Sequence, residues 1–460
     1  MSRNKMSRRQ FLTLTGAAGA SMLVLAACPA PAVESPAPGD GGGSGAAAEE
    51  VELEFLAWGD VADGDAWSTL QSNFNDQGNG ITVNVTGVPD PGNNFYTKLQ
   101  TMYAGGTPPH IASFQGWEWQ TYADRDLLAP IDEWVAEAGL EGMYPEANTI
   151  EVSTKRNGNR YLIPLQMATM VMFYAKKPFD DAGMDYPTDD WTMEDFLGMA
   201  EALTDTSGDS KMFGYQANGN WVRDIHWIRA AGAQEFDALV DPKTSMFDDQ
   251  AIIDTVQLFA QDVYYSMGIS PTAADMEGGA NTIDTGNAAM KYEGAWYFGR
   301  LDSPSLREEG KEVDFDVVMM PQGADGSRPH RGWSEGVAIP ATDQAEAAWA
   351  FASYMGGTEG NKIFSELTGR LPNSAELLES FWIPTIQERF GVENGAAFLK
   401  AFQSSEVDVI GGVTRTQMWS QVVKPVGYDP LTNNSATAAE VMPAVNEGVQ
   451  ALLDEYWAAQ

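Results

Sequence analysis

The chain has 460 residues, of which 65 are acidic and 27 basic, so its formal net charge at pH 7 is -38. A chain this negative repels phosphate backbones, which excludes nucleic acid as a partner. Hydrophobic residues make up 43% of the sequence and aromatic residues 11%. The chain can therefore bury a core, and it is long enough for two compact domains.

The N-terminus has the order of a bacterial export signal, in which basic residues precede an apolar stretch at 11–27 and then Cys28. Residues 7–12 (Ser-Arg-Arg-Gln-Phe-Leu) resemble the twin-arginine motif, and residues 25–28 (Leu-Ala-Ala-Cys) resemble a lipoprotein box. We expect a twin-arginine signal peptide at 1–27 and a lipid anchor on Cys28, which place the protein on the outer face of the cytoplasmic membrane, in the periplasm or at the cell surface. The alternative is a retained membrane span, but about 17 apolar residues are short for a bilayer.

Residues 28–50 consist mainly of Pro, Ala, Gly, Ser and acidic residues, including a run of glycines at 41–45. This composition cannot bury surface and is typical of a flexible linker. We expect the folded body to begin at residue 51.

Strands and helices alternate in the first part of the body. Alternating apolar residues predict strands at 51–56 and 81–88, and helical spacing predicts helices at 66–74 and 95–103. An apolar segment at 110–114 predicts a third strand. This alternation favours an α/β fold with a largely parallel sheet, in which ligands bind beyond the carboxyl ends of the strands.

The middle of the chain is richer in helix. Thr192 and Asp195 form a variant of the capping box that opens a helix at 191–203, and residues 250–267 have the spacing of a long amphipathic helix. The later elements that we expect are strands at 288–292, 315–319 and 336–340 and a helix at 345–355.

Six stretches of the body carry a family resemblance. Trp-Thr-Met-Glu-Asp-Phe at 191–196 and Ala-Ala-Met-Lys-Tyr-Glu-Gly-Ala-Trp at 288–296 are the most specific. Together with 96–109, 160–183, 336–351 and 369–373, and in the same order, they resemble the family 1 extracellular solute-binding proteins. That group includes maltose- and other sugar-binding components of ABC importers. One departure is His110, where the family usually has Asp.

The resemblance implies a two-lobe periplasmic-binding-protein fold with a hinge and an interlobe ligand cleft. It places the N-terminal lobe at 51–166 and 337–385, and the C-terminal lobe at 167–336 and 386–460. It also implies a monomer that closes on a small molecule and then docks on the ABC permease in the membrane.

A sugar presents apolar C–H faces and a rim of hydroxyls, so its site needs flat aromatic rings and polar side chains. Trp296 is the first candidate, because the family places a ligand-stacking aromatic there. Each Trp could instead pack in the core, and each polar residue could be a solvated loop residue. The ligand contacts that we expect are Trp58, Asp60, Gln115, Trp117, Glu118, Trp119, Gln166, Trp221, Glu293, Trp296, Trp333, Glu335, Arg370 and Trp419.

Other functions stay open at this point. The solute could be a glycerol phosphate or a polyol, although an acidic cleft mouth would disfavour an anion. An Asp/Glu pair could serve a secreted glycoside hydrolase, but the three histidines are scattered and no catalytic fingerprint is present, so we expect no enzyme. We expect no cofactor and no metal, because residues 205–209 have the alternate spacing of a calcium loop without its glycine or its distal Glu.

Overall fold

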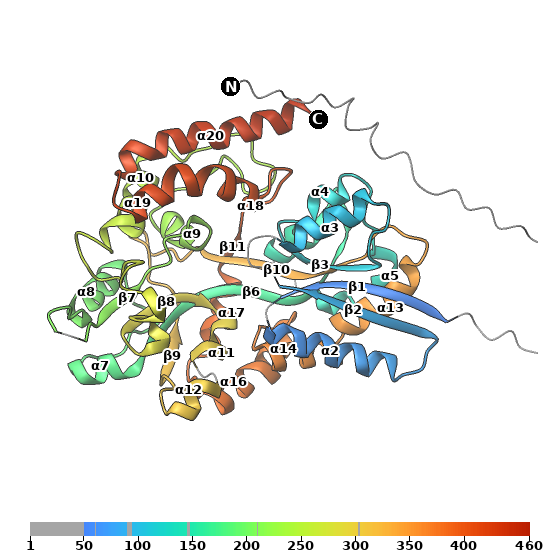
Figure 1. The fold of residues 1–460 in the computed structure, drawn as a ribbon, viewed down its shortest axis with the longest axis horizontal. Coiled ribbons are helices and arrows are strands. Elements are labelled where there is room, and N and C mark those ends of the chain that lie inside the picture. The colour runs from blue at the N-terminus through green and yellow to red at the C-terminus, as the bar shows by residue number, and fades with distance from the viewer. Residues whose placement is uncertain (1–49, 60, 90–93, 145–147, 209, 302–303) are drawn as a thin grey trace, which may run out of the picture. The chain divides into compact units, whose positions relative to one another are not determined.

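One mixed sheet of nine strands runs through the part of the chain that the computed structural model describes, namely residues 50–59, 61–89, 94–144, 148–208, 210–301 and 304–460. The strand order is β2-β1-β3-β10-β6-β8-β7, with β11 paired to β10 and β9 paired to β6 (Figure 1). The predicted signal peptide, Cys28 and the linker up to residue 49 lie outside the described residues.

The first part of the sheet follows the predicted alternation. β1 (Val51–Trp58) pairs in parallel with both β2 (Ile81–Val88) and β3 (Ile111–Gln115). Between these strands lie α2 (Val61–Asn75) and α3 (Asn94–Ala104). The three predicted strands and two predicted helices are therefore confirmed, and the carboxyl ends of β1 and β3 lie at the same edge of the sheet.

The prediction of a largely parallel sheet is wrong at the centre of the molecule. β10 (His330–Ala338) runs antiparallel to β3 and to β6 (Leu162–Ala175), and β6 runs antiparallel to β8 (Ala288–Gly294) and β9 (Phe315–Val318). Parallel pairing returns at β7 (Phe213–Gln216), beside β8. Every residue of β6 and β10 is buried, so neither strand shows the alternation that reveals a strand with one solvated face.

β6 connects the two parts of the sheet. Its residues 162–169 pair with β10, whereas residues 170–175 pair with β8 and β9. Separate hydrophobic cores lie on either part, one around Phe55 and Phe351 and another around Trp227. The lobe boundaries at 166/167, 336/337 and 385/386 stay predictions.

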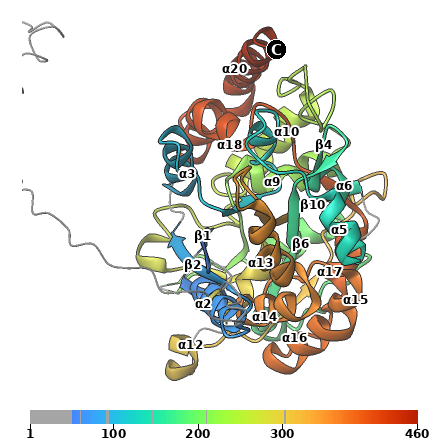
Figure 2. The same ribbon diagram turned by 90° about the vertical axis from the view of Figure 1, so that its right-hand side faces the viewer.

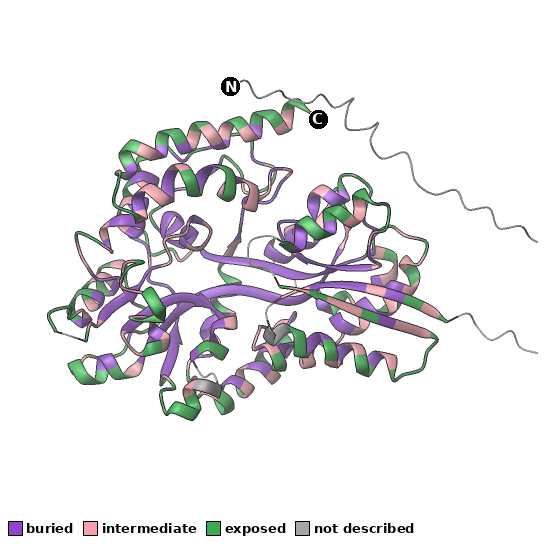
Figure 3. Ribbon diagram, in the orientation of Figure 1, coloured by how far each residue is buried: buried purple, intermediate pink, exposed green. Residues whose placement is uncertain are grey.

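Helices cover the central strands of the sheet, which are buried, whereas β2 and the start of β1 are partly exposed, as are the outer faces of the helices (Figure 3). α2 packs against α14 (Thr358–Thr368), and α13 (Ala345–Gly356) lies beside them (Figure 2). α8 (Met193–Leu203) begins at a complete capping box of Thr192 and Asp195, as predicted. Within the described residues, no helix has both the length and the apolar character that a membrane span requires.

The predicted helix at 250–267 is shorter in the structure. It consists of α10 (Gln250–Gln257) and the π-helical turn η2 (Leu258–Asp262), and its apolar face is buried as expected.

The other elements are β4 (Lys155–Arg156), β5 (Asn159–Arg160), β11 (Ser405–Val407), α4 (Gln120–Ala123), α5 (Asp132–Ala138), α6 (Asn148–Thr154), α7 (Lys176–Ala182), α9 (Trp221–Ala230), α11 (Phe298–Leu301), α12 (Pro304–Glu309), α15 (Ala375–Leu377), α16 (Ile383–Phe390), α17 (Ala396–Gln403), α18 (Arg415–Met418), α19 (Asp429–Thr432) and α20 (Ala438–Ala458), with short 3-10 or π segments η1 (Glu141–Met143), η3 (Glu277–Gly279), η4 (Ile283–Thr285), η5 (Ala295–Tyr297), η6 (Leu378–Trp382) and η7 (Trp419–Tyr428).

Candidate functional site

A cleft of about 650 Å³ brings together residues from distant parts of the chain. The end of β1, the segment after β3, the start of α9, η5, β10 and η7 all contribute to its wall. Eight of the expected ligand contacts line it, namely Trp58, Gln115, Trp117, Trp296, Trp333, Glu335, Arg370 and Trp419. The other lining residues are Asn220, Val222, Arg223, Arg331, Arg415, Thr416, Ser420 and Lys424.

Five tryptophans line the cleft, at two depths. Trp117 and Trp333 are only 2% and 3% exposed and contact each other edge to face, with ring centroids 5.7 Å apart. Trp58, Trp296 and Trp419 are half-buried. The deep pair therefore forms the back of the cleft, while the other three keep ring surface open to a ligand.

The deep tryptophans pack against two arginines. The guanidinium of Arg331 lies 3.9 Å from the Trp333 ring centre, and that of Arg415 lies 3.6 Å from the Trp117 ring centre. Both arginines bind the buried carboxylate of Asp408, Arg331 with two hydrogen bonds of 2.6 and 2.8 Å and Arg415 with one. Burial acts to raise the pKa of Asp408, but the two guanidinium groups lower it below its usual value.

Trp296 is held in place by its own turn. Its indole Nε1 donates a 2.9 Å hydrogen bond to Oε2 of Glu293, which also forms a 2.5 Å ion pair with Arg223. A Cβ at Gly294 would lie 2.2 Å from the Trp296 ring, so only glycine lets the ring fold back over this strand end. Glu293 lies behind the cleft and positions both Trp296 and Arg223.

A second polar group supports the opposite wall. Glu335 accepts hydrogen bonds from the Trp333 indole at 2.8 Å, from Gln166, and from Arg370 at 3.4 Å. The Arg370 guanidinium lies 5.4 Å from the Trp58 ring centre. Gln166 does not line the main cleft, but it lines a small adjoining cavity with Trp58, Glu335 and Arg370. It therefore orients Glu335 from behind.

The remaining expected contacts lie elsewhere. Trp119 is fully buried and donates to Ser153 O at 2.9 Å, and Trp221 is fully buried in the core with its indole 3.3 Å from Glu235. Each of these rings packs against an aromatic neighbour, Trp119 against Tyr161 and Trp221 against Phe247, so burial of a large apolar ring decides its place. Asp60, like Cys28, lies outside the described residues.

Glu118 lines an adjoining groove of about 750 Å³ and hydrogen-bonds Thr416. Tyr96, Tyr103 and Tyr122 also line this groove. Thr416 and Ser420 belong to both the groove and the cleft. The two hollows are therefore neighbours.

Sequence reasoning missed the basic residues of the cleft, chiefly Arg223, Arg331 and Arg415. One signal was available for Arg331, because it precedes Trp333 by two positions in a strand and so points to the same face. Arg415 carried no such signal, since its partner Asp408 and the Trp117 ring meet it only in the folded chain.

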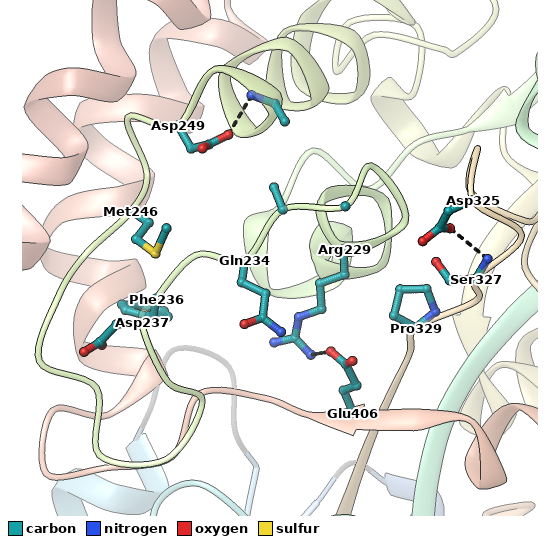
Figure 4. A pocket seen from close by; sticks show the side chains of 13 residues that line it. Arg229, Gln234, Phe236, Asp237, Met246, Asp249, Asp325, Ser327, Pro329 and Glu406 are labelled. Atoms are coloured by element: carbon teal, nitrogen blue, oxygen red, sulfur yellow. Dashed lines mark hydrogen bonds and ion pairs between the residues drawn. The ribbon is translucent and has the colours of Figure 1, made fainter.

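A further cavity of about 640 Å³ lies between α9 and the segment around Asp325 (Figure 4). Arg229 reaches into it, donates to Val407 O at 2.8 Å and lies 3.7 Å from Glu406. Carboxylates from Asp237 and Asp249 also line it, and its only aromatic lining residue among those described, Phe236, is almost fully buried. This cavity lacks the open ring surface that a sugar face requires.

The histidines are structural. The rings of His226 and His330 are buried with centroids 5.5 Å apart, and burial lowers the pKa of His330 to about 4 and that of His226 well below its usual value. Nδ1 of His110 accepts a hydrogen bond from the Glu54 amide. None of the three lines the cleft, and no cluster of metal-ligating side chains occurs within the described residues.

The comparisons with known proteins identify the family and the fold. The model of the family described as bacterial extracellular solute-binding protein matches residues 58–362. The erythritol/L-threitol-binding protein of Mycolicibacterium smegmatis is 25% identical over 302 residues, which cover 61% of each chain.

Two solved structures show a similar fold. The ABC substrate-binding protein of Listeria monocytogenes in complex with cycloalternan matches with a TM-score of 0.75 at 20% identity, over 88% of this chain and 99% of that one. UgpB of Mycobacterium tuberculosis in complex with glycerophosphocholine matches with a TM-score of 0.72 at 17% identity, over 88% and 99%. These matches confirm the predicted two-lobe α/β fold.

Proposed function

This chain belongs to the bacterial extracellular solute-binding proteins, and we propose that its tryptophan-lined cleft captures a sugar or oligosaccharide for delivery to an ABC permease. The observation that carries the proposal is the set of three half-buried rings, Trp58, Trp296 and Trp419, in one cleft with Gln115, Asn220 and Glu335. Rings of this kind stack on the C–H faces of a sugar, and amides and carboxylates bind its hydroxyls.

The mechanism is reversible capture without chemistry. The open lobes bind the solute, closure buries it, and the closed form docks on the permease. We place the lobes at 51–166 with 337–385 and at 167–336 with 386–460. The hydrogen bond between Glu118 and Thr416, 298 positions apart in sequence, joins the two proposed lobes at the edge of the cleft. It is suited to hold a closed form.

Family membership implies that the protein works outside the cytoplasm. We propose further that residues 1–27 are a twin-arginine signal peptide and that a lipid on Cys28 holds the protein, as a monomer, on the outer face of the membrane. The glycine-rich linker up to residue 50 would give the body its reach toward the permease.

A polyol is the second candidate solute, because the Mycolicibacterium relative binds erythritol and L-threitol. A glycerol phosphate compound is a third, because UgpB of Mycobacterium tuberculosis was solved with glycerophosphocholine. Catalysis is the least supported alternative, because the cleft has one lining carboxylate, Glu335, among the described residues, and the Trp333 indole, the Gln166 amide and the Arg370 guanidinium all donate to it.

A thermal-shift screen of the purified protein against mono- to tetrasaccharides, polyols and glycerol phosphates tests the proposal. A solute present at a hundredfold excess over its dissociation constant adds about 2.7 kcal/mol to the unfolding free energy. We expect one saccharide class to raise the melting temperature and to be recovered unchanged by chromatography. If only polyols or glycerol phosphates raise the melting temperature, the protein binds that class of solute instead of a saccharide. If the saccharide is consumed, the protein is a hydrolase.

A further inference from the structure

The lining of the cleft is positively charged, although the chain as a whole carries a net charge of -38. Among the described residues, five cationic side chains line the cleft and Glu335 is its only lining carboxylate. The expectation of an acidic mouth is therefore wrong for the lining itself. The cations are Arg223, Arg331, Arg370, Arg415 and Lys424.

Three of these cations each pair with a carboxylate, although Arg223 shares its partner with Lys291 at 3.9 Å. Arg223 pairs with Glu293 at 2.5 Å, Arg370 with Glu335 at 3.4 Å, and Lys424 with Asp429 at 2.6 Å. Each of these ion pairs is close to neutral overall, so it provides hydrogen-bond donors to the cleft without adding much electrostatic potential.

Arg331 and Arg415 are different, because they share the single carboxylate of Asp408. The two buried guanidinium groups thus contact one carboxylate between them, so the pair carries one positive charge more than Asp408 neutralises. Burial is the largest influence on Arg415 and lowers its pKa to about 9, although Asp408 and, more weakly, Glu118 and Glu335 act to raise it. An anion placed beside Arg415 would compensate this charge.

The same wall holds hydrogen-bond donors with no acceptor. Nε of Arg415 and the indole Nε1 of Trp117 are both buried, and neither has a partner among the described residues. The Arg415 guanidinium lies directly on the Trp117 ring, and its side chain is 8% exposed where it lines the cleft. An acceptor bound against this stack is what these two donors lack.

From this excess charge and these donors we propose that the solute is an acidic saccharide, whose anionic group binds Arg415 beside Trp117, with Arg223 as a second contact. The inference rests on the proposed saccharide function and specifies its substrate class. The anionic group is a carboxylate or a phosphate, which supply the same charged oxygen acceptors. The half-buried tryptophans then stack on the sugar ring itself.

Matched pairs of sugars test the inference by isothermal titration calorimetry. The probes are galactose, galacturonate and galactose 1-phosphate, their gluco counterparts, and digalacturonate against neutral galactobiose. We expect an acidic member to bind roughly tenfold to a hundredfold more tightly than its neutral counterpart, with the preference shrinking as salt is raised. Comparing galacturonate with galactose 1-phosphate shows whether the site prefers a carboxylate or a phosphate.

Equal or tighter binding of the neutral member of a pair would overturn the inference and leave the proposed function standing. If no saccharide binds, neutral or acidic, the proposed function falls together with the inference. The two failures are therefore distinguishable in one set of titrations.

Substitutions test which residues cause the preference for an acidic sugar. Arg415→Gln should weaken the acidic sugar roughly tenfold to a hundredfold and leave its neutral counterpart nearly unchanged. Arg223→Gln, at a side chain that is 33% exposed, tests the same preference if Arg415→Gln does not fold. Arg300→Gln, with a side chain 68% exposed and outside the cleft, is the matched control for loss of one charge. Retention of the preference in both cleft variants would contradict the assignment.

Discussion

Two groups of aromatic side chains differ in this protein. In the core, Trp227 stacks on Phe259 with ring centroids 4.2 Å apart and an interplanar angle of 4°, and both rings are almost fully buried. In the cleft, Trp58 and Trp296 are half-buried and face arginines rather than other apolar side chains alone. A sequence rich in aromatics therefore does not mark a binding site by itself, and the neighbours and exposure of each ring decide its role.

The largest expected effect comes from breaking the core group. Trp227→Ala should lower the unfolding free energy by roughly 3–5 kcal/mol, because it removes a large buried ring and leaves a cavity. Urea unfolding followed by circular dichroism measures the change. The fraction of the variant that stays folded should keep its affinity for the solute. A loss of unfolding free energy no larger than that of an ordinary surface substitution would show that the stacking does not stabilise the fold.

The buried histidines give the stability of the core a pH dependence. An unfolded histidine has a pKa near 6.5, whereas that of folded His330 is lowered to about 4, mainly by burial. The unfolded state therefore binds the proton first, and the contribution of His330 to the unfolding free energy should fall by roughly 3 kcal/mol as the pH drops from about 6.5 to about 4. Chemical unfolding at a series of pH values measures this slope, and an unchanged slope in His330→Gln would contradict the assignment.

A smaller effect should follow from moving a cleft ring without deleting it. Gly294→Ala puts a Cβ 2.2 Å from the Trp296 ring, so the ring must leave its place. We expect solute affinity to fall roughly tenfold, a change of about 1.4 kcal/mol, with little change in melting temperature. Gly299→Ala is the matched control, because its new Cβ meets nothing within 4 Å. Equal affinities in the two variants would show that the position of Trp296 does not matter.

The elements with one solvated face could be predicted from the sequence. β1 and β2 show alternation, and the capping box of Thr192 and Asp195 is a local signal between residues three positions apart. β6 could not be recognised, because all 14 of its residues are buried and its apolar run has no period. The central antiparallel pairing was missed with it.

The site was predicted only where a local pattern pointed to it. Trp296 follows a recognisable strand and turn, whereas Trp117 and Trp119 stand two positions apart in one segment and lie in different surroundings, one in the cleft wall and one in the core. The Asp408 pairing with Arg331 spans 77 positions. Neither the orientation of a ring after a turn nor such a long-range ion pair leaves a trace in local spacing.

The measurement that tests the central claim most directly is a calorimetric titration of the best saccharide from the screen into the wild-type protein, Trp296→Ala and Trp349→Ala. Trp349 is also half-buried but lies on α13, outside the cleft. We predict that Trp296→Ala loses about 2 kcal/mol of binding free energy, roughly thirtyfold in affinity, while Trp349→Ala binds like the wild type. Equal affinities for all three proteins would contradict the claim that the tryptophan-lined cleft is the saccharide site.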